Sequence, residues 1–222
     1  MEKEKSRLME GKERLEQGRY RFNRDILKES ISIFEELINK EPDEYLYYYY
    51  LGCAYEGVAL LCEINGDDEG KKEWGKKVIE AMEKSIELND EFLDSHRALG
   101  QMCGSMITDP FTAMKYISKA EREMSIVMNL NPEDLNVCLW QAIKYIKAPK
   151  PFGGNIEKAM EKCRQIIETN PKFDQAYVWW GIACEKDGKL EKAKDCWEKA
   201  LSINPNNLHA QKNLTQVIKM TT

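Results

Sequence analysis

The segment between residues 170 and 205 constrains the fold more than any other part of the sequence. Asn170-Pro171 stands at its start and Asn204-Pro205 at its end, so the two prolines are 34 residues apart. On both sides of Gly188, apolar and small residues recur at steps of three and four, which is the spacing of two amphipathic helices joined by a turn. These positions are Tyr177, Trp180, Gly181, Cys184, Ala193, Trp197, Ala200 and Leu201. Such a helical pair buries its apolar face only against a neighbour, so the segment predicts a stack of hairpins.

The same register recurs upstream, after similar boundaries at Glu41-Pro42, Asn89-Asp90 and Asn131-Pro132. We expect the capping side chain of these boundaries, with the proline where one is present, to begin the following helix. A small residue stands ten residues after each boundary, at Gly52, Gly100, Ala142 and Gly181. A second column stands eight residues before each boundary, at Phe34, Met82, Met124, Cys163 and Trp197. Agreement in several columns predicts five hairpins and a buried Trp197.

These columns resemble the tetratricopeptide repeat (TPR), a helical hairpin with small residues where its helices cross. The resemblance covers nearly the whole chain. It implies an all-α fold, a right-handed α-solenoid (superhelix) of about five TPR helical hairpins plus a C-terminal capping helix. We expect a single domain over residues 1–222, with repeats at about 1–42, 43–90, 91–132, 133–171 and 172–205 and a capping helix at 206–220.

Three hairpins are longer than the 34-residue unit, and the extra residues fall between their two helices. In the second hairpin the helical pattern continues on both sides of Asn65-Gly66, which predicts two helices that are each about two turns longer. The third hairpin is expected to turn at residues 108–110 and the fourth to carry an irregular loop at residues 147–155, "KAPKPFGGN". In the tyrosine-rich stretch "EYLYYYYLGCAYEG", the helical stripe predicts that Tyr48 and Tyr55 lie in the core.

Charge and hydropathy argue against two classes of partner. The formal net charge is −5, and acidic and basic residues are interleaved, so the chain offers no concentrated basic surface for nucleic acid. No apolar run is long enough for a membrane helix, and the charged start "MEKEKSRLMEGKERLEQG" has no apolar secretion segment. We therefore expect a cytoplasmic protein that binds neither nucleic acid nor membranes.

Residues that commonly carry chemistry are few and scattered. The seven cysteines include no CxxC pair, so we expect free, buried thiols and no metal site. The only histidines, His96 and His209, fall on separate helices, and His96 occupies a core column. We expect no catalytic residue, no cofactor and no enzymatic activity.

The resemblance also implies a concave groove lined by the first helices of successive hairpins. Carried over position by position, the expected partner-binding residues are Leu46, Tyr49, Cys53, Arg97, Gln101, Leu139, Ile143, Ile146, Val178 and Ile182. Members that grip chaperone tails place basic and amide side chains at four of these positions, which here hold Tyr49, Cys53, Leu139 and Ile143. An exposed apolar strip of this kind favours a hydrophobic helix or an extended segment as the partner.

The resulting hypothesis is a non-catalytic scaffold or adaptor that binds a peptide or helical segment of another protein in the groove. On this hypothesis, Asp at both Leu139 and Ile143 would abolish binding and leave helicity intact. Two alternatives stay open. The chain itself or a second subunit, as in a homodimer, could cover the groove. The protein could also carry a small apolar ligand, similar to the TPR proteins of TRAP-type solute transport systems, whose loops the "KAPKPFGGN" loop resembles.

Overall fold

The computed structural model describes residues 2–221, and within that range it contains only helices and connecting turns. The helices are α1 (Glu2–Tyr20), α2 (Arg24–Lys40), α3 (Tyr45–Ile64), α4 (Asp68–Leu88), α5 (Leu93–Ser105), α6 (Pro110–Leu130), α7 (Leu135–Lys147), the short 3-10 helix η1 (Lys150–Phe152), α8 (Ile156–Thr169), α9 (Asp174–Lys186), α10 (Leu190–Ile203) and α11 (Leu208–Thr221). The predicted all-α class is confirmed.

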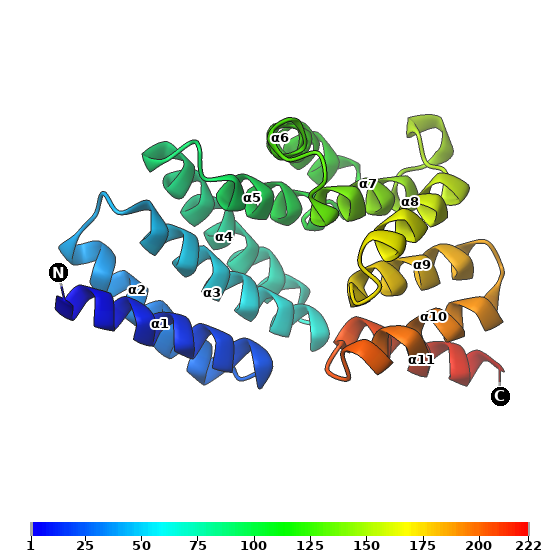
Figure 1. Ribbon diagram of the computed structural model, residues 1–222, viewed down its shortest axis with the longest axis horizontal. Helices are drawn as coiled ribbons and strands as arrows, with labels where there is room; N and C mark the ends of the chain where they lie inside the picture. The colour runs from blue at the N-terminus through cyan, green and yellow to red at the C-terminus, as the bar shows by residue number, and fades with distance from the viewer. Residues whose placement is uncertain (1, 222) are drawn as a thin grey trace. The chain divides into compact units, whose positions relative to one another are not determined.

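The chain forms two compact units, which meet in sequence at Leu130 and Asn131. In unit 1, α1 pairs with α2, α3 with α4 and α5 with α6, while α2 also packs on α3 and α4 on α5 (Figure 1). In unit 2, α7 pairs with α8 and α9 with α10, and α11 packs on α10 (Figure 1). The predicted hairpins and the final helix are therefore present. The grouping of all of them into one domain stays a prediction.

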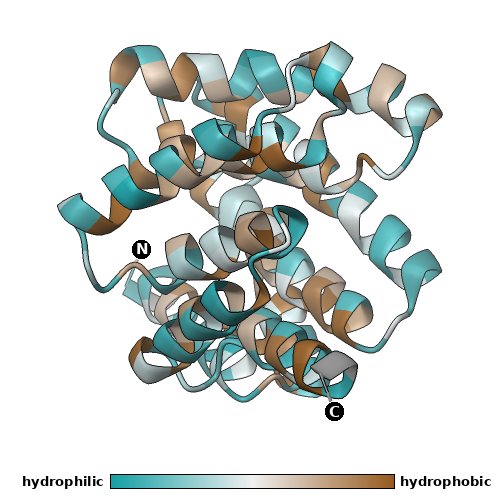
Figure 2. Ribbon diagram, turned by 90° about the vertical axis from the view of Figure 1, so that its right-hand side faces the viewer, coloured by the Kyte–Doolittle hydropathy of each residue, from teal (hydrophilic) through white to brown (hydrophobic). Residues whose placement is uncertain are grey.

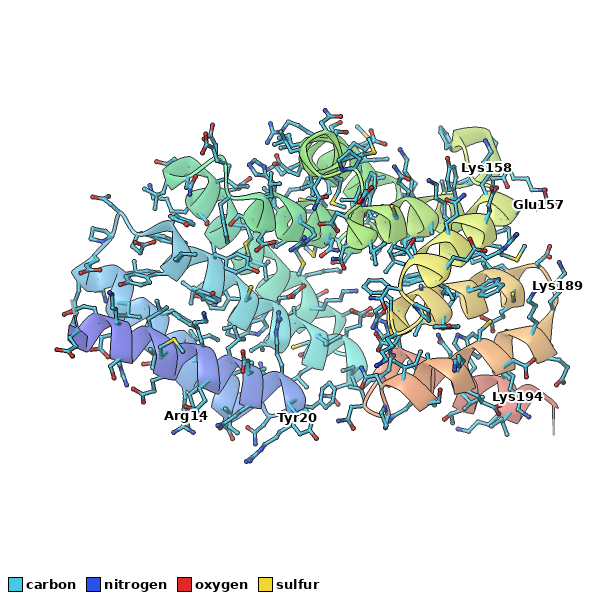
Figure 3. All side chains as sticks on the ribbon, viewed as in Figure 1. Arg14, Tyr20, Glu157, Lys158, Lys189 and Lys194 are labelled. Atoms are coloured by element: carbon cyan, nitrogen blue, oxygen red, sulfur yellow. The ribbon has the colours of Figure 1, made fainter. Side chains whose placement is uncertain are left out.

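Each unit is held together by the apolar stripes of its helices. Apolar and polar residues alternate around the helices (Figure 2), as helical periodicity requires. Long charged side chains point outward, and Figure 3 labels Arg14 on α1, Glu157 and Lys158 on α8, and Lys194 on α10 as examples. The stripes thus bury the columns read from the sequence.

The second hairpin has the predicted extra length. Helices α3 and α4 contain 20 and 21 residues, whereas α9 and α10 contain 13 and 14. The difference is about two turns in each helix. The turn falls at the predicted place, because Gly66 has a φ of 72° and the Asp67 side chain accepts a hydrogen bond from the Gly70 N–H at 2.8 Å. The predicted turn after α5 and the irregular loop around η1 are also present.

The prediction that the capping side chains of the repeat boundaries begin the following helices is wrong. Asn89, Asn170 and Asn204 instead cap the C-termini of the preceding helices. The side-chain oxygen of each accepts a hydrogen bond from the backbone N–H two residues later, at 3.0–3.2 Å. This local bond competes with helix continuation and closes a turn. The following helix therefore begins three residues after Pro171, at Asp174.

The tyrosine-rich stretch lies in α3, but its buried face is displaced from the predicted one. Tyr47 is buried, and its hydroxyl donates a hydrogen bond to the Glu41 carboxylate at 2.9 Å. Tyr48 and Tyr55 are only half-buried, which corrects their assignment to the core. The Tyr55 hydroxyl donates to Glu35 at 3.1 Å, so this ring packs with its polar end at the surface.

The core of unit 2 centres on Trp197, which is fully buried as predicted. Its indole N–H donates to the Val178 carbonyl at 3.1 Å. Gly181 lies directly against the ring, and a Cβ built there would clash with the indole nitrogen and with the carbon atoms bonded to it. The glycine is therefore required by the close approach of α9 to α10.

Gly181→Val is expected to lower the free energy of unfolding by about 1–3 kcal/mol, because the added side chain must displace Trp197 from a fully packed position. Glu198→Val on the exposed face of α10 serves as the control for the poor helix propensity of valine. Urea unfolding followed by circular dichroism measures both. Equal stabilities of the two variants would show that the Gly181 contact is unimportant.

Candidate functional site

The first helices of the three hairpins of unit 1 share a face on which polar and aromatic side chains meet. Arg19 at the end of α1 reaches α3, where its Nη2 donates to the Cys53 carbonyl oxygen at 3.0 Å and forms an ion pair with Glu56. Both charged side chains are about 40% exposed, so the pair lies at the surface. The contact connects two successive first helices and neutralises both charges locally.

Tyr49 continues this face from α3 toward α5. Its ring makes edge-on contacts with Phe92 and Tyr50, with ring centroids 5.0 and 5.1 Å apart. Burial raises the pKa of the Tyr49 hydroxyl, which interacts with the Cys53 thiol and lies near the ion pair of Asp94 and Arg97. Burial likewise raises the pKa of Cys53 to about 12. Both groups are therefore uncharged at neutral pH.

A hollow of about 360 Å³ adjoins the Arg19–Glu56 pair. Its lining residues come from all three hairpins of unit 1 and are mainly apolar: Gly18, Arg19, Phe22, Leu27, Glu56, Gly57, Ala59, Leu60, Leu61, Glu63, Lys71, Met102 and Ser105. The extra turns of α3 supply Ala59, Leu60, Leu61 and Glu63. The unusual length of the second hairpin therefore builds one wall of the hollow.

The rim of the hollow carries equal numbers of positive and negative side chains. Besides Arg19 and Glu56, it contains Lys71, whose Nζ lies 3.0 Å from the Glu63 carboxylate. The lining also includes the half-buried Leu60 and the buried Gly57. The arrangement presents an apolar floor inside a rim whose charges compensate each other. We call this hollow, together with Tyr49 and the Arg19–Glu56 pair, the first-helix site.

The ten residues predicted for a groove fall into two groups. Six are half-buried and reach the surface: Leu46, Tyr49, Arg97, Gln101, Ile143 and Ile182. Four are buried, with exposed fractions of at most 7%: Cys53, Leu139, Ile146 and Val178. The expectation of an exposed apolar strip is wrong at these four positions, because they pack inside their own units. Val178, for example, shares a cluster with Trp197 and Ala210.

The burial of Leu139 also changes which substitutions can test binding. Leu139 packs with Ile166 and Ala176 in the interior of unit 2. Aspartate at this position would place a carboxylate in an apolar environment and would destabilise the unit. If the variant with Asp at both Leu139 and Ile143 lost binding, the cause would be unfolding of unit 2. The structure does not support the prediction that this variant keeps its helicity.

Sequence reasoning missed three surface residues. Glu56 stands fourteen residues after Pro42, the position that Ile146 occupies after Pro132, but only Ile146 was predicted to line the groove. Arg19, the partner of Glu56, was not among the residues carried over from the family. Trp179 was also missed. It is half-buried between the Leu139 and Ile146 clusters, and the Lys147 Nζ lies 5.9 Å from its ring centroid. Counting residues from the boundary could have identified Glu56. Trp179 was overlooked because the adjacent Trp180 was assigned to the apolar face of the same helix.

His96 is buried and engaged, as its core column predicts. Its Nδ1 lies 2.6 Å from a Glu123 carboxylate oxygen, and its Nε2 donates to the Asp90 carbonyl at 2.8 Å. Both ring nitrogens therefore have partners within unit 1. The cysteines likewise match their prediction, because all seven are free thiols and six are buried. Among the described residues, no helix is both long and apolar enough to span a membrane.

The stacked hairpins place the chain in the class of α-helical repeat proteins. A family model for the tetratricopeptide repeat matches residues 174–207, which contain α9 and α10. The solved TPR protein TTC0263 of Thermus thermophilus is similar in fold, with a TM-score of 0.67 and 14% identity over 94% of this chain and 99% of that one. MamA of Desulfovibrio magneticus RS-1 matches with a TM-score of 0.51 and 12% identity over 90% and 97% of the two chains.

An uncharacterised protein of Methanocaldococcus jannaschii is 30% identical over 60 residues, which are 27% of this chain and 70% of that protein. Together with the recurring columns and the hairpin geometry, these comparisons identify the chain as a tetratricopeptide repeat protein. Proteins of this family are typically non-catalytic repeat scaffolds, and this membership supports a general role in protein interaction.

Proposed function

We propose that the protein is a non-catalytic scaffold that holds a peptide or helical segment of another protein at the first-helix site of unit 1. The observation that carries this proposal is the apolar hollow bordered by two compensated ion pairs. Binding sites commonly combine an apolar depression with a few polar groups that fix orientation. The site spans three successive first helices, which gives an extended segment room to lie across them.

The chemistry of the site favours an uncharged apolar anchor in the partner. The rim has no net charge, so it offers no attraction to an excess of either sign. A hollow of about 360 Å³ accommodates one or two large apolar side chains, which are the usual anchors of a bound segment. The Arg19–Glu56 pair borders this anchor, and the half-buried Tyr49 lies further along α3; both are suited to polar contacts with the partner's backbone.

A displayed random-peptide library tests the proposal with the purified protein as bait. Leu60→Asp is the site variant, because Leu60 lines the hollow and is half-buried. Phe152→Asp is the matched control, since Phe152 is 79% exposed and lies in unit 2. Peptides enriched on the parent protein are expected to contain a bulky apolar residue and to bind Leu60→Asp about 10–100-fold more weakly, because a carboxylate in the hollow rejects an apolar anchor.

Circular dichroism establishes that both variants keep the parent's helicity before binding is compared. Peptides that bind the parent and Leu60→Asp equally well, or that lose affinity only in Phe152→Asp, would exclude the first-helix site. A small apolar ligand is the runner-up occupant, favoured by the apolar floor of the hollow. Native mass spectrometry of the purified protein distinguishes it as a bound mass that Leu60→Asp removes. Homodimer formation and a cytoplasmic location stay predictions.

A further inference from the structure

The turn between α1 and α2 holds a phenylalanine in a backbone conformation that favours glycine. Phe22 has a φ of 50°, and no other residue except glycine has a positive φ in the described part of the chain. The Asn23 N–H donates to the Gly18 carbonyl at 2.9 Å, and the Phe22 N–H donates to the Arg19 carbonyl at 3.3 Å. These two bonds define a Schellman motif, in which the left-handed residue is usually glycine.

The same motif joins the helices of two other hairpins, and both of these turns have glycine at the left-handed position. Gly66 and Gly188 have φ values of 72° and 77°. In each turn, the N–H of the following residue donates to the carbonyl five positions earlier, at 2.8 and 2.9 Å. A side chain at such a position destabilises the turn relative to glycine, because its Cβ crowds the following carbonyl oxygen. The turn geometry therefore does not explain the phenylalanine at position 22.

Phe22 lines the hollow of the first-helix site, where accessible apolar surface is scarce. Among the apolar side chains of the lining, Phe22 and Leu60 are half-buried and the others are buried. Phe22 belongs to the turn of the first hairpin and Leu60 to the first helix of the second. These two side chains therefore supply most of the apolar surface that is open to a bound segment.

We propose that Phe22 is a contact residue for the apolar anchor of the bound segment, kept at this position although glycine would make the turn more stable. This inference rests on the proposed function, because the ring meets a partner only if the hollow is the binding site. Backbone strain of this kind is concentrated at sites that hold ligands. Glycine would relax the turn, but it would leave Leu60 as the one half-buried apolar side chain of the hollow.

Two reciprocal substitutions separate binding from folding. Phe22→Gly is expected to unfold at a urea concentration equal to or above the parent's, and to bind peptides selected on the parent at least about tenfold more weakly. Gly188→Phe is the matched control in unit 2, where a Cβ meets no other atom within 4 Å, so only the left-handed backbone is strained. It is expected to unfold at a lower urea concentration and to bind the peptides as the parent does.

Titration calorimetry with the same peptides and Leu60→Asp distinguishes this proposal from the proposed function. If Leu60→Asp loses the peptides but Phe22→Gly binds them fully, the hollow stays the site and the role of Phe22 is overturned. If Leu60→Asp binds as the parent does, or no peptide binds the parent, both proposals fail. A lower urea midpoint for Phe22→Gly would also overturn the role of Phe22, because the ring would then be kept for folding. Circular dichroism without urea confirms that each variant is folded.

Discussion

Trp197→Ala is expected to lower the free energy of unfolding of unit 2 by about 3–5 kcal/mol, the range for removing a fully buried large aromatic side chain. Two effects contribute. The substitution empties a position with no exposed surface, at the contact between α9 and α10. It also removes the indole N–H that donates a hydrogen bond to the Val178 carbonyl. Since Gly181 offers no side chain to fill the space, the cavity cannot close easily.

Guanidinium unfolding followed by far-ultraviolet circular dichroism measures this loss without relying on tryptophan emission. Phe152→Ala is the control, because it also removes an aromatic ring but from a residue that is 79% exposed. Its stability is expected to stay within about 0.5 kcal/mol of the parent's. If Trp197→Ala were equally mild, the central packing role of Trp197 would be wrong.

Glu123→Ala is expected to destabilise unit 1 by about 3–5 kcal/mol, because it leaves one member of a buried pair without its partner. Glu123 and His96 have exposed fractions of 1% and 4% and lie 2.6 Å apart. Arg122 donates two further hydrogen bonds to the second carboxylate oxygen, at 2.5 and 2.8 Å. The Asp90 carbonyl can only accept, so the His96 Nε2 carries a proton and its Nδ1 faces Glu123.

The exposed pair of Glu83 and Lys119 supplies the control for this second prediction. Glu83→Ala is expected to cost less than about 1 kcal/mol, as is usual for ion pairs at the surface. The double variant His96→Leu and Glu123→Leu is expected to recover part of the stability lost in Glu123→Ala, because neither member of the His96–Glu123 pair is left without its partner. Urea unfolding measures the three variants. A double variant no more stable than Glu123→Ala would contradict the coupling.

The fold was predictable because its determinants recur at fixed spacings. Trp197 occupies a column that appears in all five hairpins and Gly181 one that appears in four, and Asn65-Gly66 interrupts one long helical pattern. The details that failed depend on rotation of a helix about its axis, since neighbouring residues point about 100° apart. Tyr47 is buried in place of Tyr48 for this reason. Small differences in helix packing decide which face is covered, and columns alone do not encode them.

The candidate site was less predictable than the fold. Tyr49 is half-buried on α3, and its role in a groove stays a prediction; the hollow itself adjoins the contact of Arg19 with Glu56 across two hairpins. These residues lie 37 positions apart, and no local pattern connects them. Val178 was predicted to line the groove because its position does so in the family. Here it is buried, at the place where α9 packs closely on α10 at Gly181. The recurring columns therefore do not predict which side chains of different helices meet.

Hydrogen–deuterium exchange with a selected peptide tests the proposed function most directly. The parent protein is compared with and without saturating peptide, and Leu60→Asp is measured under the same conditions. Slower exchange on peptide addition is expected in the C-terminal halves of α1, α3 and α5, which border the hollow, and is expected to be absent in Leu60→Asp. Protection confined to α4, α6 or the helices of unit 2, or protection that persists in Leu60→Asp, would contradict binding at the first-helix site.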